Sequence, residues 1–259
     1  MDIENIRGFT VGRVHLSRVD STNDFLRRES SSLFLSFPTC DLFVVTADVQ
    51  SAGRGQRGSV WQSAVGDNLL VSILLRPLAV KASRSFLLSP VAALAVKKCV
   101  ACFGIDALLK WPNDLYFNNA KLAGILLEVD FEGANLSQAI VGIGLNVNQK
   151  EFAAMERNPV SMSLIQGTDF CVNKVGRVFV DEFLRLYNLF LQGGDDALLA
   201  EYEQLLMGRQ TAMLYRDSAG VFEATVHGVE SDGRIRLMRG DGQLSYYSFK
   251  EVQMVSLGY

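Results

Sequence analysis

Residues 50–61 decide the fold; they read QSAGRGQRGSVW and stand between two apolar runs. The runs, residues 42–49 and 68–75, are rich in β-branched and large apolar residues, and both predict buried β-strands. The G-x-G-x-x-G spacing that begins at Gly53 matches the dinucleotide-binding fingerprint, which requires a helix directly after the third glycine. A strand follows here instead, and no acidic residue ends a second strand about 20 residues later. The spacing also fits a kinase glycine loop, but no His-Arg-Asp or Asp-Phe-Gly follows it. The stretch therefore predicts a loop between two strands.

This loop has the chemistry of an anion-binding segment. Its three glycines let the backbone approach a ligand closely and present N–H donors to it. Arg54 and Arg57 add planar guanidinium groups, which pair well with phosphate or carboxylate. A loop of this kind is expected to close over an anion when one binds. A solvated hairpin tip without a ligand explains the composition equally well.

Outward from the loop, the apolar pattern predicts an α+β fold. Continuous or alternating apolar runs predict strands, and apolar residues at helical spacing predict helices. The expected strands are residues 11–19, 42–49, 68–75, 107–111, 121–131 and 139–147. The expected helices begin at the capping box Ser21-Thr22-Asn23-Asp24 and lie at 83–103, 172–191 and 195–206.

The pattern of apolar residues in the sequence changes near residue 208. From there on, short alternating runs are separated by turn sequences such as Asp232-Gly233 and Asp241-Gly242, which are typical of hairpins. We therefore expect two domains. Residues 1–206 form a mixed sheet with flanking helices, and residues 207–259 form a small β-barrel or sandwich.

The composition excludes several classes of protein. The chain has 259 residues, of which 49% are hydrophobic and 20% charged, and its formal net charge of −3 argues against a nucleic-acid binder held by phosphate contacts. The longest apolar run, residues 87–96, is about half of what a bilayer span requires. The acidic N-terminus does not resemble a signal peptide. We expect a soluble cytoplasmic protein that does not bind membranes. Cys99 and Cys102, one helical turn apart, are expected to be two buried thiols rather than metal ligands.

A second group of polar residues lies between apolar strands. Lys110-Trp111-Pro112-Asn113-Asp114 precedes a turn, and Lys121 then begins a strand that is otherwise almost wholly apolar. Lys121 either reaches the surface at the strand end or neutralises charge that develops during acyl transfer. Asn113 and Asp114 are turn formers that could also bind Mg²⁺ or orient an attacking amine. Gly142 and Gly144, inside a later strand, mark either a bulge or the close approach of a ligand or of another backbone segment.

Taken together, these segments resemble the biotin protein ligases. The matching segments stand in the family's order at residues 21–23, 50–58 with Trp61, 110–115, 121–126 and 142–146, and they span about residues 17–148. Any one of these motifs is weak, whereas the ordered set is highly specific. The resemblance implies a class II synthetase-like catalytic domain followed by an SH3-like β-barrel. It also implies two half-reactions. Biotin and Mg·ATP give biotinyl-5′-adenylate and pyrophosphate, and a lysine of a biotin carboxyl carrier protein then attacks the adenylate and releases AMP.

The resemblance assigns a role to each matching residue. Residues with catalytic roles are Lys121, Arg54 and Asp114. The biotin-binding residues are Ser21, Thr22, Asn23, Gln50, Arg54, Gly55, Gln56 and Lys121. The ATP- or adenylate-binding residues are Arg54, Arg57, Gly58, Trp61, Lys110, Asn113 and Asn146. Mg²⁺ is the implied cofactor, biotin and ATP are the substrates, and no residue is assigned to a resident metal.

Two features of this sequence differ from the family pattern. Gln56 and Ser59 stand where many relatives have arginine, so we expect a weaker hold on the reactive adenylate. Relatives that also repress transcription carry a winged helix before the Ser-Thr-Asn motif. Only 20 residues precede Ser21 here, so we expect a monofunctional ligase that does not bind DNA. Whether two copies of the chain pair is left open.

Two other functions compete with this interpretation. The first is a lipoate or octanoate ligase or transferase, which has the same fold and a reactive-site lysine. The glycine-arginine loop, the tryptophan after it and the Lys-Trp-Pro-Asn-Asp sequence favour biotin over this alternative. The second is a biotin- or nucleotide-binding regulator without catalysis, and the presence of both Lys121 and Arg54 argues against it.

Overall fold

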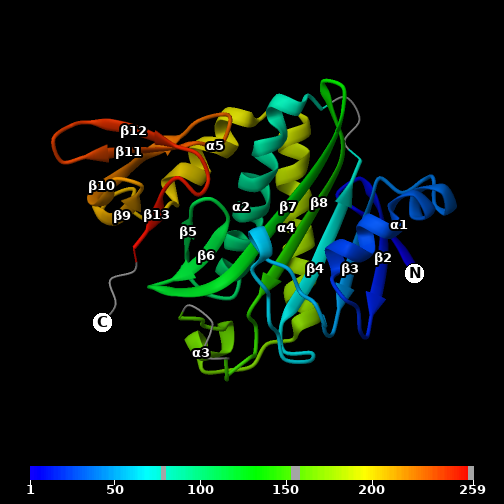
Figure 1. The fold of residues 1–259 in the computed structure, drawn as a ribbon. Coiled ribbons are helices and arrows are strands. Elements are labelled where there is room, and N and C mark those ends of the chain that lie inside the picture. Colours follow the sequence, from blue (N-terminus) through cyan, green and yellow to red (C-terminus); the bar gives the residue numbers. More distant parts are fainter. Residues whose placement is uncertain (77–79, 153–157, 256–259) are drawn as a thin grey trace.

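The computed structural model describes residues 1–76, 80–152 and 158–255, and these residues form two sheets (Figure 1). The larger sheet has eight strands in the order β1-β2-β3-β4-β8-β7-β6-β5. Its strands are β1 (Asp2–Ile6), β2 (Phe9–Leu16), β3 (Leu42–Ala47), β4 (Leu69–Leu75), β5 (Leu108–Lys110), β6 (Asp114–Phe117), β7 (Ala120–Glu132) and β8 (Asn135–Leu145). β2 and β3 are parallel and the other neighbours are antiparallel, so the expected mixed sheet is confirmed.

Helix α1 (Thr22–Ser36) makes the crossover between the two parallel strands β2 and β3. It begins as predicted at Ser21, whose hydroxyl accepts a hydrogen bond from the backbone N–H of Asp24 at 3.4 Å. Its apolar side packs on one face of the sheet, where Leu26 is buried together with Phe43 of β3. Because α1 covers only this end of the face, the remainder of the same face is left for other groups (Figure 1).

The opposite face of the sheet is covered by α2 (Leu88–Ala101) and α4 (Val172–Leu191), with α5 (Asp195–Gln204) beside them (Figure 1). α4 has the predicted bounds, and its apolar stripe, with Phe179 and Phe183 at its centre, is fully buried. The helix expected at 83–103 is divided into a 3-10 turn, η2 (Ala82–Leu87), and α2. Pro90 lies in the first turn of α2, where its missing N–H has no intrahelical partner to lose.

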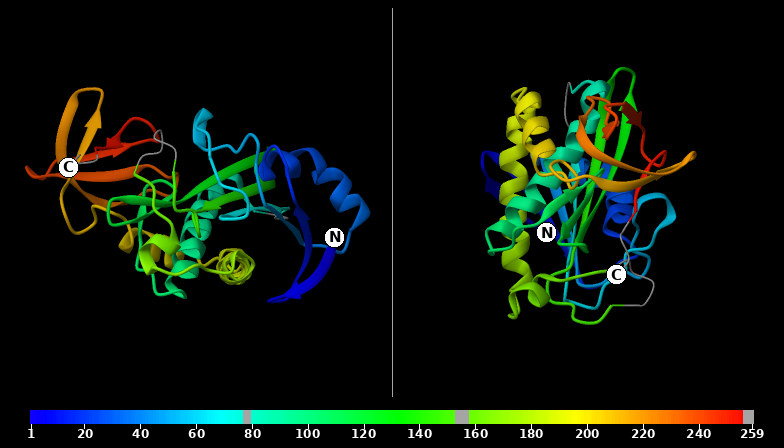
Figure 2. Two further views of the ribbon diagram at one scale, coloured as in Figure 1. Left: turned by 90° about the horizontal axis from the view of Figure 1, so that it is seen from below. Right: turned by 90° about the vertical axis from the view of Figure 1, so that its left-hand side faces the viewer.

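The second sheet lies at one end of the molecule and the N-terminal hairpin at the other (Figure 2). The strand order of this second sheet is β12-β11-β10-β9-β13, and all neighbouring strands are antiparallel. The strands are β9 (Met213–Asp217), β10 (Gly220–Val229), β11 (Ile235–Arg239), β12 (Leu244–Tyr247) and β13 (Gln253–Met254). Glu203 of α5 ties this sheet to the larger body, since its Oε1 accepts a hydrogen bond from the Val229 N–H at 2.6 Å.

Further details differ from the sequence analysis. Strand β1 was not expected, because its exposed polar residues give an edge strand no apolar pattern, and β6 was not expected, because it has only four residues and lies between two turn sequences. The short helix α3 (Met162–Gln166) was also missed. Cys99 is buried as expected, but Cys102 is exposed, so the expectation of two buried thiols is wrong for the second. Cys102 caps the last turn of α2 and faces away from the core that surrounds Cys99. No helix among the described residues is both long and apolar enough to cross a membrane.

Candidate active site

A bulge in β7 brings the polar residues of this strand to one face. The pairing with β6 moves from Leu115–Ala123 to Tyr116–Lys121, so β7 carries one extra residue at this point. Leu122 and Ala123 are consecutive and both fully buried in the core. Since the bulge interrupts the alternation, Lys121 projects from the same face as Gly124, Leu126 and Glu128. The Lys-Leu-Ala-Gly sequence thus places a lysine over the uncovered part of the sheet.

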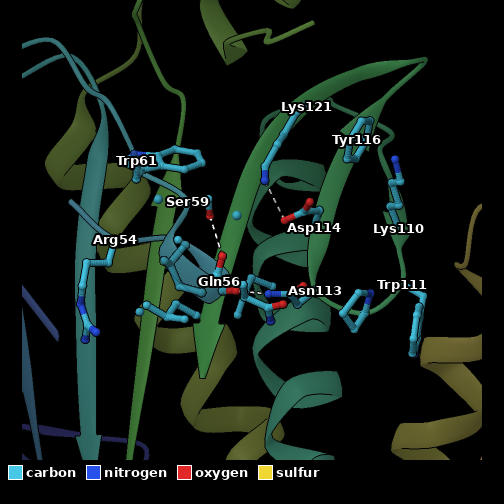
Figure 3. A pocket seen from close by; sticks show the side chains of 18 of the residues that line it. Arg54, Gln56, Ser59, Trp61, Lys110, Trp111, Asn113, Asp114, Tyr116 and Lys121 are labelled. Atoms are coloured by element: carbon cyan, nitrogen blue, oxygen red, sulfur yellow. Dashed lines mark hydrogen bonds and ion pairs between the residues drawn. The ribbon is translucent and has the colours of Figure 1, made fainter. Parts of the chain in front are cut away.

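A cavity of about 780 Å³ lies over this part of the sheet (Figure 3). Its volume is within the range of small-molecule sites, about 300–1,000 Å³. The floor is formed by β7 and β8, one wall by the loop of residues 50–61, and another wall by the C-terminal sheet. The residues assigned from the sequence that line it are Ser21, Thr22, Asn23, Gln50, Arg54, Gly55, Gln56, Trp61, Lys110, Asn113, Asp114, Lys121 and Asn146.

Lys121 and Asp114 form an ion pair at the floor of the cavity. The Lys121 Nζ lies 2.9 Å from Asp114 Oδ1, and the two side chains are 29% and 28% exposed. The ammonium also lies 5.8 Å from the ring centre of Trp61. Figure 3 shows Lys121 directed inward from its strand toward Asp114. The interpretation of Lys121 as a lysine that merely reaches the surface is therefore wrong.

The turn that carries Asp114 is fixed from several sides. The Asn113 amide donates to the carbonyl of Ile125, and the Ile125 N–H donates back to the Asn113 carbonyl at 3.1 Å. The fully buried Tyr202 donates its hydroxyl to the Pro112 carbonyl at 2.7 Å. The Trp111 indole donates to the Gly233 carbonyl at 3.1 Å. Asp114 is consequently presented on a rigid element, and Asn113 serves the backbone rather than the cavity.

A buried polar network lines the other end of the cavity. Gln50 Oε1 accepts from both the N–H (2.7 Å) and the hydroxyl (3.1 Å) of Thr22. Ser72, a polar residue within the apolar strand β4, lies 2.7 Å from Thr22 Oγ1 and 2.6 Å from Asn23 Oδ1. Its single proton can be donated to only one of them at a time. Because Gln50 Oε1 already accepts two bonds, the amide nitrogen of Gln50 is the donor left for a ligand.

The glycines of the floor permit two close approaches. A Cβ at Gly142 would lie 2.2 Å from Asn23 Oδ1, and a Cβ at Gly144 would lie 2.3 Å from Trp61 Cε2. Gly124 faces the same indole, at 3.0 Å. The Trp61 ring therefore lies directly on the sheet, and its buried Nε1 has no hydrogen-bond partner among the described residues. The pairing of β8 with β4 and β7 has no register shift at Gly142 or Gly144, so they do not mark a bulge, and the groups that approach them are the side chains of Asn23 and Trp61 rather than backbone.

Arg54 lies away from Lys121 (Figure 3). One guanidinium nitrogen lies 2.9 Å from both carboxylate oxygens of Glu128 and 2.8 Å from Asp24 Oδ1. Glu128 stands seven positions beyond Lys121 in β7, a separation of about 20 Å along a strand. Arg54 and Lys121, which the resemblance assigns to one binding site, are therefore held by different carboxylates in this conformation.

The tip of the loop contains the two departures from the family pattern. Residues Gln56–Gly58 form the 3-10 turn η1, and the Ser59 hydroxyl donates to the Gln56 carbonyl at 2.8 Å. A Cβ at Gly55 would lie 2.3 Å from the Ser59 hydroxyl, so the tip is tightly closed. Gln56 and Ser59 both line the cavity. The Arg57 side chain is outside the part of the chain that the structure describes.

Two residues assigned to the nucleotide have other contacts. The Lys110 Nζ lies 4.8 Å from the ring centre of Tyr116, at the outer end of the cavity. The Asn146 amide donates to the Val160 carbonyl at 3.1 Å and lies 3.4 Å from the Lys121 carbonyl. Asn146 therefore braces the beginning of β7 as well as lining the cavity.

The sequence analysis missed two groups of residues. The first is the acidic pair Asp24 and Glu128. Asp24 was interpreted only as part of the capping box, and Glu128 stands inside a strand whose preceding residues are apolar. The second comes from the C-terminal sheet, which closes one side of the cavity, and nothing in the sequence indicated this. Its lining residues are Tyr215, Ile235, Phe249, Lys250, Val252, Gln253 and Met254.

Solved structures superpose on this fold over nearly the whole chain. The biotin protein ligase from Aquifex aeolicus in complex with biotin and ATP superposes with a TM-score of 0.75 at 22% identity, covering 94% of this chain and 99% of that one. The biotin protein ligase from Leishmania major in complex with biotinyl-5-AMP gives 0.61 at 19% identity, covering 92% and 98%. These likenesses define the class of fold, an α+β ligase-type domain with a separate C-terminal antiparallel sheet.

The sequence comparisons define the family. Residues 16–146, just over half of the chain, match the biotin/lipoate A/B protein ligase family. The bifunctional ligase/repressor BirA of Escherichia coli is 30% identical over 240 residues, covering 89% of this chain and 72% of the relative. BirA of Bacillus subtilis is 31% identical over 210 residues, and the chain spans 64% of that relative's length. The biotin–[acetyl-CoA-carboxylase] ligase of Paracoccus denitrificans is 39% identical over 135 residues, covering 51% and 53%. The chain belongs to the biotin/lipoate A/B protein ligase family.

Proposed function

We propose that this protein is an ATP-dependent biotin–[biotin carboxyl carrier protein] ligase. It activates biotin as biotinyl-5′-AMP and transfers the biotinyl group to a lysine of the carrier. The observation that carries the proposal is the Lys121–Asp114 ion pair, set 2.9 Å apart at the floor of a cavity of about 780 Å³. The names of two relatives, the biotin–[acetyl-CoA-carboxylase] ligases of Paracoccus denitrificans and Mycobacterium tuberculosis, support the choice of substrate.

The first half-reaction has an electrostatic barrier that Lys121 can lower. A biotin carboxylate oxygen attacks the α-phosphorus of ATP, the bond to pyrophosphate breaks, and a mixed anhydride forms. Two unit charges about 4 Å apart repel by about 4 kcal/mol at an effective dielectric constant of 20. An ammonium group already fixed at the floor of the site offsets this repulsion without having to reorganise during the reaction. Lys121 would exchange its partner Asp114 for the substrate oxygens.

The polar network at the opposite end would hold the ring system of biotin. Gln50 and Thr22 are fixed against each other by two hydrogen bonds, and Ser21 and Asn23 lie beside them as buried polar groups. This end offers hydrogen-bond donors and acceptors for a cyclic urea, while Lys121 awaits the carboxyl group. A ligand held at both ends is oriented for attack.

The second half-reaction would use Asp114. The amine of the carrier lysine attacks the acyl carbon, the bond to the phosphate oxygen breaks, and AMP departs as the amide forms. Asp114 loses its ion-pair partner when Lys121 turns to the substrate, so its carboxylate becomes available to orient the attacking amine. Trp61 and Asn146 would line the adenylate, and the Trp61 Nε1, which has no partner among the described residues, could donate to it.

Mg²⁺ is proposed as the cofactor that accompanies ATP. No group of three or more His, Cys, Asp or Glu residues comes together among the described residues. This donor set fits an ion that is held mainly by phosphate oxygens and water, with Asp114 as the nearby carboxylate. When bound, Mg²⁺ would neutralise phosphate charge.

The proposal extends to the organisation of the chain. Residues 1–206 would form the catalytic domain and residues 207–259 an SH3-like domain that closes the nucleotide end of the cavity. The position of Phe249 and Lys250 in the cavity lining supports this division. Lipoate or octanoate transfer remains the alternative, since the family includes lipoate ligases.

The experiment is ATP–pyrophosphate exchange measured with biotin, lipoate and octanoate in turn. We expect exchange with biotin alone, and transfer of biotin to a carrier domain that has its acceptor lysine. The same carrier with arginine in place of that lysine is the control. Exchange only with lipoate or octanoate would replace the proposal by its alternative, and exchange with none of the three would reject catalysis of this kind.

A further inference from the structure

The carboxylates that hold Arg54 have no role in the chemistry described above. Asp24 belongs to the first turn of α1, and Glu128 belongs to β7, whereas Arg54 belongs to the loop of residues 50–61. The guanidinium therefore joins the loop to two separate elements of the rigid body, at 2.8 Å and 2.9 Å. We refer to Asp24, Arg54 and Glu128 as the Arg54 cluster.

The Arg54 cluster is continuous with the polar network at the biotin end of the cavity. Glu128 Oε2 accepts a hydrogen bond from the Asn23 amide at 2.8 Å, and Asn23 Oδ1 lies 2.6 Å from the Ser72 hydroxyl. The sheet is shaped for this contact, because any side chain at Gly142 would displace the Asn23 amide. Glu128 is only 18% exposed, and Arg27 approaches its other oxygen at 3.4 Å. The carboxylate is thus fixed before the loop reaches it.

The loop itself is a closed hairpin. The Trp61 N–H donates to the Gly53 carbonyl at 2.9 Å, and the Gly55 N–H donates to the Ser59 carbonyl at 2.7 Å. These bonds hold the two arms of the loop to each other. The base of the loop is tied to the body by the N–H groups of Ser51 and Ala52, which donate to the carbonyls of Val19 and Asp20 at 2.9 Å. Beyond this base, the position of the loop over the cavity depends on side-chain contacts. Arg54 lies in the arm that leads to the tip. Its guanidinium group supplies such a contact by pairing with the carboxylates of Asp24 and Glu128.

We propose that Asp24 and Glu128 are positioning residues that hold the loop over the cavity through Arg54, and so set how long biotinyl-5′-AMP is retained. This inference rests on the proposed ligase function. In it, Arg54 acts on the loop and not on the reacting carboxyl group. The adenylate itself contacts other residues, Lys121 among them. Loss of the Arg54 cluster therefore changes the rate of adenylate release far more than the rate of adenylate formation.

The test compares Glu128→Gln with Asp130→Asn in the full-length chain. The glutamine oxygen can still accept from Asn23, so the variant removes the charge and keeps this hydrogen bond. Asp130 lies two positions further along β7 and pairs with Arg27 at 3.5 Å without touching Arg54, which makes it a matched control. Adenylate is formed from radiolabelled biotin and ATP, and its release is followed after a chase with unlabelled biotin.

We expect Glu128→Gln to release the adenylate about fivefold faster, since partly exposed ion pairs contribute up to about 1 kcal/mol. Asp24→Asn should give a smaller increase, because Asp24 is more exposed and makes a single contact. Asp130→Asn should match the unmodified protein. Added salt should accelerate release more in the unmodified protein than in Glu128→Gln, because only the ion pair of Arg54 with Asp24 is left to be screened in the variant.

A second measurement does not depend on the reaction. Tryptic cleavage within residues 50–61 should be faster in Glu128→Gln than in Asp130→Asn, because the loop is held less often against the body. Equal cleavage rates and equal release rates in the two variants would overturn the inference while leaving the ligase function intact. An unmodified protein that forms no adenylate would instead reject the proposed function, and the inference about retention with it.

Discussion

Alanine at Gly144 should reduce activity strongly while changing stability little. A Cβ at this position would lie 2.3 Å from Cε2 and 2.7 Å from Cδ2 and Cζ2 of Trp61. Carbon atoms rest about 3.5–4.0 Å apart, so the indole must move away from the sheet by about 1.2 Å. The indole is only partly buried and can move toward the cavity. The loss in free energy of unfolding should therefore be near the lower end of the range for overpacking, about 1 kcal/mol.

The effect on catalysis should be larger than the effect on folding. The displaced ring would enter the cavity close to Lys121, whose ammonium lies 5.8 Å from the ring centre. A misplacement of about 1 Å in a reactive geometry can reduce the rate about 100-fold. We therefore expect kcat/KM for biotin-dependent ATP–pyrophosphate exchange to fall about 10- to 100-fold in Gly144→Ala, with a change in Tm of a few degrees.

Two further variants isolate the cause. Gly240→Ala, at a glycine with ordinary φ and no atom within 4 Å of its Cβ, should behave like the unmodified protein. Trp61→Phe removes the part of the ring that the new methyl group meets, so Gly144→Ala should cost less in that background, a coupling of about 1 kcal/mol or more. Activity of Gly144→Ala within twofold of the unmodified protein, or strictly additive effects in the double variant, would refute the reasoning.

Three other outcomes are expected. Lys121→Gln keeps a polar group but removes the charge, and should lower the rate of adenylate formation about 100-fold or more with modest effect on Tm, measured by single-turnover quench. Gln56→Arg restores a cation to the tip of the loop and should slow adenylate release severalfold; an unchanged release rate would show that this position does not hold the anion. At pH 8 a thiol reagent should label the two exposed cysteines rapidly and the two buried ones only after denaturation. Burial raises the pKa of Cys99 from 9.0 to about 12, so its contribution to stability is complete below pH 9 and is lost as the pH rises toward 12. The free energy of unfolding measured by urea titration should therefore fall less between pH 9 and pH 12 in Cys99→Ala than in the unmodified protein.

The sequence predicted the fold wherever periodicity was strong. The helix at 172–191 was found with its observed bounds, because one stripe of its residues is apolar and buried. Strands β3 and β4 were found because almost all of their residues are apolar and buried. β1 was missed because an exposed edge strand has no apolar pattern. Helix 83–103 was expected as one element, since a 3-10 turn and an α-helix bury side chains at nearly the same spacing.

The candidate site was predicted as a list of residues but not as an arrangement. Motif order indicated that Lys121 and the loop belong to one site, and both line the cavity. The bulge that turns Lys121 to this face leaves no mark in the sequence, because Leu122 and Ala123 look like ordinary strand residues. The direction of Arg54 could not be foreseen either. It depends on Glu128, which is 74 positions away in the chain and near it only in the fold.

Lys121 and Arg54 are both paired with carboxylates before any substrate arrives, and this has a consequence for how the site works. Lys121 is held by one carboxylate at 2.9 Å, so an incoming anion can replace Asp114 by a partner of equal charge, and the exchange requires little reorganisation. Arg54 is held by two carboxylates from different elements, and one substrate oxygen could not replace both. The single pairing therefore suits a group that acts on the substrate, while the double pairing suits a group that holds the loop. The number of carboxylates around each cation, rather than its position in a motif, distinguishes their roles.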